Sequence, residues 1–187
     1  MLLRLLIVLV VLASVQAKTK EYVYSSDTGD VHDVLQDREN IVIKHTGKAH
    51  LWIQYLGNAS LIRATNAEGA GTFVLSYSGQ GDLLAENQGG NMIMTIGRGN
   101  GDISAMHRTA ASTTIMQMEP KTNRKKNMYS DGTGRSELIS NDGPVYAMNT
   151  GSGELKVIVR RCSDVKQLTN KGSGTTKAFD EKSGKQC

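Results

Sequence analysis

The chain is poor in the residue types that usually indicate a function. Cysteine occurs only twice, and aromatic residues make up 5% of the 187 residues. Two cysteines cannot form a disulfide-rich scaffold, so the fold must bury a core of its own, and a chain of this length can do so. Because aromatic rings are scarce, we expect methionine to help fill that core.

Catalytic and nucleotide-binding motifs are missing as well. The sequence has no G-x-S-x-G, no H-E-x-x-H, no Walker loop, and no G-x-G-x-x-G between a strand and a helix. The formal net charge of +4 is small, whereas nucleic-acid binding usually needs a concentrated basic face. The sequence therefore favours a non-enzymatic protein and gives no support to nucleic-acid binding.

A long apolar run occurs only at the N-terminus. Arg4 precedes an apolar run from Leu5 to Leu12, and Val15 and Ala17 stand at the −3 and −1 positions of a small-residue cleavage site. The run is shorter than the ~20 residues of a membrane span. We predict a signal peptide over residues 1–17, export from the cell and no membrane span, with an uncleaved anchor as the alternative.

The two cysteines, Cys162 and Cys187, are expected to pair in an oxidising compartment. The bond would tie a polar C-terminal tail, residues 163–187, to the end of the last strand. We expect this tail to be a poorly ordered loop. The alternative is an intermolecular bridge through Cys187.

Between these segments, residues 18–162 are predicted to form one all-β domain. Short alternating apolar runs are separated by glycine-rich turns, with strands expected every 8–12 residues. The basic segment Lys121–Lys126 interrupts them and is predicted to be an exposed loop. The clearest runs are Ile41–Lys44, Leu51–Leu56, Thr72–Tyr77, Met92–Ile96, Val145–Met148 and Leu155–Arg160.

One stretch is periodic. Successive blocks of ten begin at Gly69, Gly79, Gly89 and Gly99, and a residue that tolerates positive φ recurs at the third position of each block. The pattern fits an antiparallel β-sandwich or barrel of many short strands, which we favour because such folds are common. The alternative is a β-solenoid with coils of ~20 residues.

A hairpin over Ile41–Leu56 would place four candidate ligand-binding residues on one face. With a turn at Gly47-Lys48, the side chains of His45, His50, Trp52 and Gln54 alternate to the same side. An indole ring beside hydrogen-bonding groups can stack on a sugar. The competing interpretation places Trp52 in the core. Two histidines are too few for a zinc site, so no metal is assigned to them.

Three further residues carry weaker signals. Asp82 and Asp102 follow near-identical Gly-x-Gly turns that resemble the calcium turns of RTX β-rolls and the repeats of bacterial β-solenoid adhesins. The resemblance covers roughly 35 residues, fails in the intervening block and lacks the nine-residue period. It would imply calcium, for which plain turn chemistry is the competing explanation. Asn58 opens an Asn-Ala-Ser glycosylation sequon between two predicted strands.

These observations favour a secreted, extracellular binding or structural module that needs no cofactor. We expect it to contact a glycan, a matrix component or another protein through its loops or a strand face. The alternatives are a secreted hydrolase acting on polysaccharide and a self-associating adhesive or matrix protein, which exposed strand edges would favour.

Overall fold

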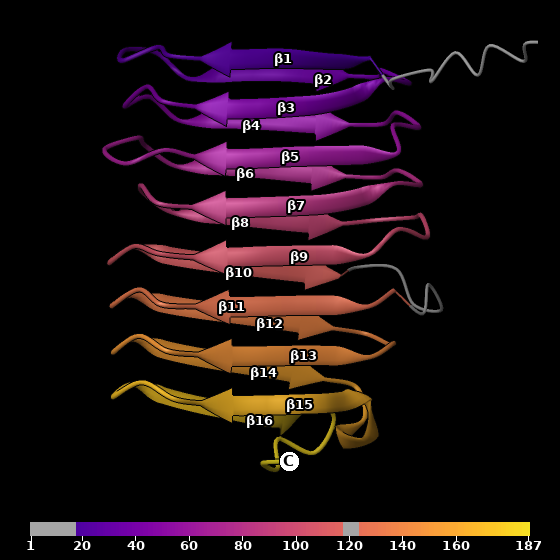
Figure 1. Cartoon of the computed structure of the whole chain (residues 1–187), viewed down its shortest axis with the longest axis vertical. Coiled ribbons are helices and arrows are strands. Elements are labelled where there is room, and N and C mark those ends of the chain that lie inside the picture. The colour runs from indigo at the N-terminus through magenta and orange to yellow at the C-terminus, as the bar shows by residue number, and fades with distance from the viewer. Residues whose placement is uncertain (1–17, 118–123) are drawn as a thin grey trace, which may run out of the picture.

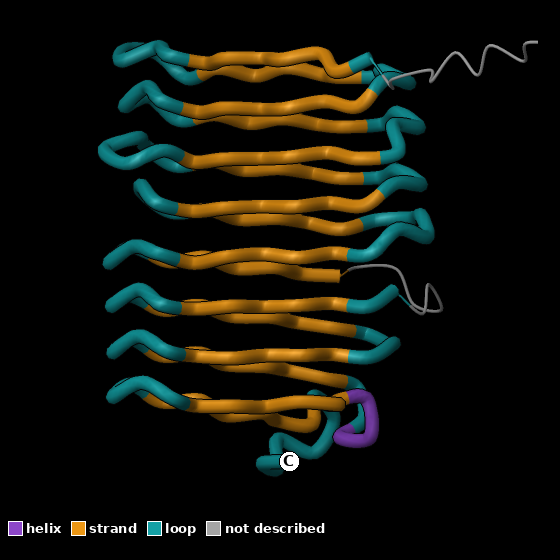
Figure 2. Tube along the Cα trace, in the orientation of Figure 1, coloured by secondary structure: helices purple, strands orange, loops and turns teal. Residues whose placement is uncertain are grey.

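A computed structural model describes residues 18–117 and 124–187 of the chain; the predicted signal peptide lies outside these residues. The described residues form a β-solenoid in which sixteen strands lie in two parallel sheets of eight (Figure 1). Successive strands alternate between the sheets, so a coil consists of one odd-numbered strand, one even-numbered strand and the two turns that follow them. The coils stack along one axis (Figure 2).

The odd-numbered sheet contains β1 (Thr19–Tyr24), β3 (Asn40–His45), β5 (Leu61–Asn66), β7 (Asp82–Asn87), β9 (Ile103–His107), β11 (Lys126–Ser130), β13 (Val145–Asn149) and β15 (Val165–Asn170). The even-numbered sheet contains β2 (Val31–Leu35), β4 (Leu51–Tyr55), β6 (Phe73–Tyr77), β8 (Met92–Ile96), β10 (Ser112–Gln117), β12 (Arg135–Ser140), β14 (Glu154–Val159) and β16 (Thr175–Asp180).

The all-β prediction is confirmed, and of the two architectures the solenoid is the one that the structure has. The antiparallel sandwich or barrel is wrong, because each strand pairs in parallel with the strand two places along the chain. The hairpin over Ile41–Leu56 is wrong for the same reason. β3 pairs with β1 and β5, whereas β4 pairs with β2 and β6 in the other sheet.

The core lies between the sheets and is built from ladders of equivalent side chains. In the even-numbered sheet, the central inward position holds an aliphatic side chain or methionine on every coil from β4 to β14. These residues are Ile53, Leu75, Met94, Ile115, Leu138 and Val157, each at most 2% exposed. Met92 and Met94 are fully buried, as the scarcity of aromatic residues led us to expect.

A polar ladder runs through one corner of the core. His45, Asn66, Asn87 and His107 occupy the same position on successive odd-numbered strands and are all buried. Asn66 donates from Nδ2 to Oδ1 of Asn87 at 3.1 Å and to the Gly71 carbonyl at 3.1 Å. The ladder therefore satisfies turn carbonyls that would otherwise be buried without a partner.

The recurrent glycines are required by close approach of the coils. A Cβ atom built on Gly101 would lie 2.0 Å from the carbonyl oxygen of Gly81, and one on Gly81 would lie 2.0 Å from that of Ala59. Neither position has a positive φ, whereas Gly69 and Gly99 do. The glycine period therefore reflects backbone stacking at the corners as well as turn conformation.

The two ends of the solenoid are closed differently. At the N-terminal end, the Tyr24 hydroxyl donates to Asp33 at 2.6 Å, the Tyr22 hydroxyl donates to Asp37, and Lys20 pairs with Asp37 at 3.0 Å. These polar side chains of the first coil interrupt the apolar ladders. Charged groups that point inward from an edge strand oppose the addition of further strands.

At the C-terminal end, the predicted disulfide is confirmed between Cys162 and Cys187. The expectation of a poorly ordered tail is wrong, because residues 163–187 contain β15 and β16, the last coil. The final residues fold back onto β16, where the Cys187 amide donates to the Ala178 carbonyl at 2.8 Å. The polar composition of β15 and β16 hid these strands, since one side of an end coil has no neighbour to bury.

Adjacent residues of β6 test this orientation of the strands. Leu75 is fully buried and Val74 points outward on the same strand. We expect Leu75→Ala to lower the free energy of unfolding by about 2–5 kcal/mol through loss of burial and a cavity, and Val74→Ala by under about 1 kcal/mol. Urea unfolding of both variants measures the difference. Equal losses would contradict the assignment of inward and outward faces.

Candidate functional site

The structure separates the four residues that the predicted hairpin brought together. His45 points into the core, where Nδ1 lies 2.8 Å from Oδ1 of Asn66 and Nε2 lies 3.0 Å from the Ala49 carbonyl. His50 is exposed in the turn before β4, and Trp52 and Gln54 point outward from β4. His45 is therefore unavailable to a ligand, and the interpretation of Trp52 as a core residue is also wrong.

Trp52, Gln54 and their neighbours line a cleft of about 550 Å³ on the outer face of the even-numbered sheet, which we call the Trp52 cleft. The ring of His32 on β2 stacks on the indole at 4.6 Å with an interplanar angle of 5°. His50 approaches the indole edge-on at 5.7 Å. One face of the indole is thus covered by a protein ring, which reduces the area available for stacking on a sugar.

The candidate calcium ligands serve as links between coils. Oδ1 of Asp82 accepts the amide of Asp102 at 2.9 Å, and Oδ1 of Asp102 accepts the amide of Lys125 at 3.3 Å. Each carboxylate therefore caps the backbone of the following coil. Within the described residues, no group of three or more His, Cys, Asp or Glu side chains is placed to hold a metal ion. Asn58 is exposed in the turn between β4 and β5.

A second groove lies on the outer face of the odd-numbered sheet and has a volume of about 460 Å³. We call it the odd-sheet groove. Its floor is the backbone of the central position of each strand, and its walls are two columns of outward side chains that stack in register. One wall contains Arg63, Leu84, Ser104, Asn127, Tyr146 and Gln167. The other contains Thr65, Glu86, Met106, Tyr129 and Met148.

The two walls of the odd-sheet groove differ in chemistry at its centre. One wall offers the Ser104 hydroxyl and the Asn127 amide, joined by a hydrogen bond of 2.9 Å. The opposite wall offers the apolar surface of Met106, Tyr129 and Met148. The groove thus has a polar side and an apolar side, and its volume falls in the range of small-ligand sites.

Charged groups stand near the two ends of the odd-sheet groove. Arg63 and Glu86 lie toward β5 and β7, and Glu86 pairs with Arg108 at 3.5 Å. Near the other end, the Lys125 amine lies 4.9 Å from the ring centroid of Tyr146. Among the described groove residues from Ser104 to Met148, none of the side chains that form the walls is charged.

This groove was missed at the sequence level, although a signal for it exists. Met106, Tyr129 and Met148 recur at about the length of one coil, so their side chains stack once the register is known. The expectation that methionine fills the core applies to only some of the methionines. Alternation within each strand instead places Met92 and Met94 inside and Met106 and Met148 outside.

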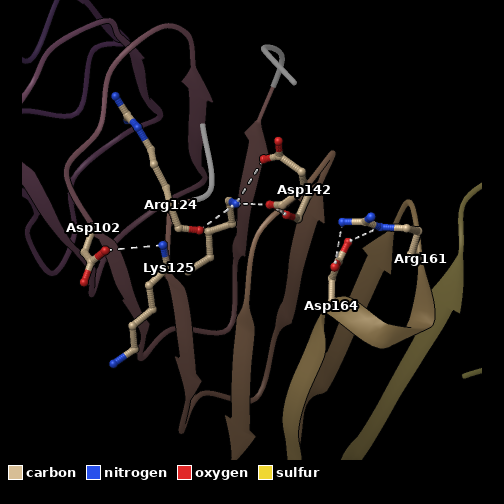
Figure 3. Close-up of polar contacts among 8 residues, drawn as sticks. Asp102, Arg124, Lys125, Asp142, Arg161 and Asp164 are labelled. Carbon is tan, nitrogen blue, oxygen red and sulfur yellow. Dashed lines mark hydrogen bonds and ion pairs between the residues drawn. The ribbon is translucent and has the colours of Figure 1, made fainter. Parts of the chain in front are cut away.

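A cluster of charged residues lies at the corner of the solenoid that precedes β11 (Figure 3). The described part of the predicted basic loop is not exposed at Arg124 or Lys126, both of which are buried; residues 118–123 lie outside the described ranges. Nη2 of Arg124 donates to the Gly79 carbonyl at 2.7 Å, and its guanidinium lies 5.4 Å from the Tyr77 ring centroid. Burial lowers the pKa of Arg124. These contacts tie the coil of β11 back to that of β6.

Lys126 occupies an apolar ladder position, between Ile103 on one coil and Val145 on the next. Its Nζ donates to the Arg124 carbonyl at 2.8 Å and to the Asp142 carbonyl. Burial lowers the pKa of Lys126 to about 8, although the Asp142 carboxylate, 4.0 Å away, opposes this shift. On the surface beyond, Arg161 and Asp164 form a two-point ion pair at 3.1 and 3.2 Å (Figure 3). Arg124 and Lys126 are buried, so solvent does not reach these two cations, and we assign them a structural role.

Comparison of the chain with protein-family models, with curated proteins and with solved structures finds no match. In the part of the chain that the structure describes, no helix is long and apolar enough to cross a bilayer. The odd-sheet groove is therefore assigned as the candidate site from its geometry alone.

Lys126 makes stability depend on pH. Between about pH 8 and pH 10, the folded chain releases the Lys126 proton while the unfolded chain, with a pKa of 10.5, retains it. The unfolded state then binds more protons, so stability rises with pH, by about 2 kcal/mol over this window. We expect Lys126→Met to remove this rise in urea titrations, whereas Lys125→Met, at an exposed neighbour, leaves it. Parallel pH profiles for Lys126→Met and wild type would contradict the assignment.

Proposed function

We propose that the chain is a secreted, non-enzymatic binding module and that the odd-sheet groove holds an elongated extracellular ligand: a glycan, a matrix component or a protein. The observation that carries the proposal is the groove itself, in which Met106 and Tyr129 face the polar side chains Ser104 and Asn127, and Met148 faces Tyr146. Rows of outward apolar side chains beside hydrogen-bonding groups are the usual composition of a ligand site. The apolar N-terminal run and the cleavage site after Ala17 support export.

The alternative functions receive less support. A polysaccharide hydrolase would need two facing carboxyl groups, and among the described residues that line the odd-sheet groove only Glu86 is acidic. Self-association through strand edges is opposed at the N-terminal end by Lys20 and Asp33. At the C-terminal end the disulfide-tied tail covers part of the edge of β16.

Introduction of a charge into the groove tests its role. We expect Met148→Glu to weaken binding to the natural ligand at least about tenfold, because the carboxylate would be desolvated without a partner. The matched control is Ile158→Glu, at an outward position of β14 on the other sheet. Binding of the purified chain to an array of extracellular glycans and matrix proteins measures the effect. Equal retention of binding by both variants would contradict the placement of the site.

One expression experiment tests both the export of the chain and the N-glycosylation of Asn58. Expressed in a eukaryotic secretory pathway, the chain is expected in the medium, beginning at Lys18 and carrying one N-glycan, because the Asn58 side chain is exposed. Asn58→Gln should remove the glycan mass, and Asn100→Gln, an exposed asparagine outside any sequon, should leave it. Intact mass spectrometry of the secreted protein measures both. Retention of residues 1–17 or an unmodified Asn58 would contradict this part of the proposal.

A further inference from the structure

We propose that the ligand of the odd-sheet groove is an uncharged linear polysaccharide that lies along the solenoid axis with about one sugar per coil. This inference rests on the proposed function and names the class of ligand for the same groove. Four properties of the groove lead to it: the pairing of its backbone, its repeat distance, the chemistry of its two walls and the distribution of its charge.

The backbone beneath the groove is unavailable to a ligand. β7, β9, β11 and β13 each pair with a strand on both sides, so their amides and carbonyls are used in the sheet. An extended peptide that binds a sheet normally does so at an edge, where backbone groups are free. A ligand in this groove must therefore be recognised by side chains alone.

The repeat distance of the groove matches a sugar chain better than a peptide. Neighbouring strands lie ~4.8 Å apart, so the groove presents one pair of wall residues per ~4.8 Å over roughly 24 Å from β5 to β15. A pyranose ring in an extended β-1,4-linked chain advances by about one strand spacing. An extended peptide repeats its side-chain direction every ~6.6 Å and loses phase with the coils after one or two of them.

The chemistry of the two walls also matches a sugar ring. A pyranose has an apolar face of C–H bonds and a rim of hydroxyl groups. Tyr129 and Met148 offer an apolar contact surface for the first, and Ser104 and Asn127 offer donors and acceptors for the second. The tyrosine hydroxyl is held in place, since Tyr129 Oη lies 2.8 Å from Oγ1 of Thr150.

The charge distribution favours an uncharged chain. The side chains that form the walls from Ser104 to Met148 are neutral. At the β5–β7 end, Glu86 pairs with Arg108 at 3.5 Å, and Arg63 is the cation of the described walls. An acidic polysaccharide would need cationic side chains repeated along the walls, where Arg63 alone is basic among the described wall residues. Arg108 and Lys125 contact the wall residues Met106 and Tyr146 but are not themselves part of the walls. Binding is therefore expected to be insensitive to salt, because no ion pairs are screened.

Isothermal titration calorimetry of the disulfide-bonded chain with neutral β-1,4-linked oligosaccharides of glucose and of N-acetylglucosamine tests the inference. We expect affinity to rise with length up to about six sugars, one for each strand of the groove. It should be unchanged between low and high salt. Tyr129→Ala and Tyr146→Ala should each weaken binding up to about tenfold, and Trp52→Ala, on the opposite face, should not. Circular dichroism establishes that each variant is folded.

A parallel titration uses a neutral apolar fluorophore, an acidic polysaccharide and an extended peptide. It distinguishes a wrong ligand class from a wrong assignment of the groove as a ligand site. Salt-sensitive binding of the acidic polymer, or binding of the peptide or fluorophore alone, would overturn the neutral polysaccharide while the groove remains a ligand site, provided that Met148→Glu abolishes that binding. If no probe binds, or if Met148→Glu leaves every interaction unchanged, both the ligand class and the groove are overturned.

Discussion

The parallel, in-register pairing of each strand with the strand two places along the chain is the constraint on which this molecule depends. It stacks each strand residue on its equivalents in the neighbouring coils, so a substitution changes the packing against the equivalent residues on both sides. Leu75 packs between Ile53 and Met94 in its ladder, and Asn66 links His45 to Asn87. The corners follow the same rule, since Gly101 has room for no Cβ atom above Gly81.

The same register builds the candidate site. Two outward positions per strand become two continuous walls, and the groove between them follows the axis of the solenoid. A recognition surface of this kind is rigid, because the wall residues from Arg63 to Met148 are anchored in strands paired on both sides, and only Gln167 lies on an edge strand, β15. Because the walls are formed by strands, no flexible loop has to become ordered when a ligand binds. The entropic cost of binding is therefore small, and modest contacts can give useful affinity. The fold thus offers length and repetition rather than a deep, closed pocket.

Much of the fold was predictable from the sequence, but the site was not. Alternating apolar residues and periodic glycines identified most strands from Ile41 onward and their ~20-residue double spacing. Alternation looks the same in a hairpin and in a crossover, so the side chain of His45 was placed beside Trp52 instead of in the core. The odd-sheet groove depends on residues such as Met106 and Tyr129, which are brought together only once strand direction and register are fixed.

The unequal closure of the two ends has a consequence for how the molecule comes apart. In a solenoid each coil is stabilised by its neighbours alone, so disassembly starts where a terminal coil can peel away. The last coil is fastened covalently by Cys162 and Cys187, whereas the first is fastened by hydrogen bonds of Tyr22 and Tyr24. Fraying should therefore travel from the amino end, and protection of amides from hydrogen exchange should increase toward the far end of the rod.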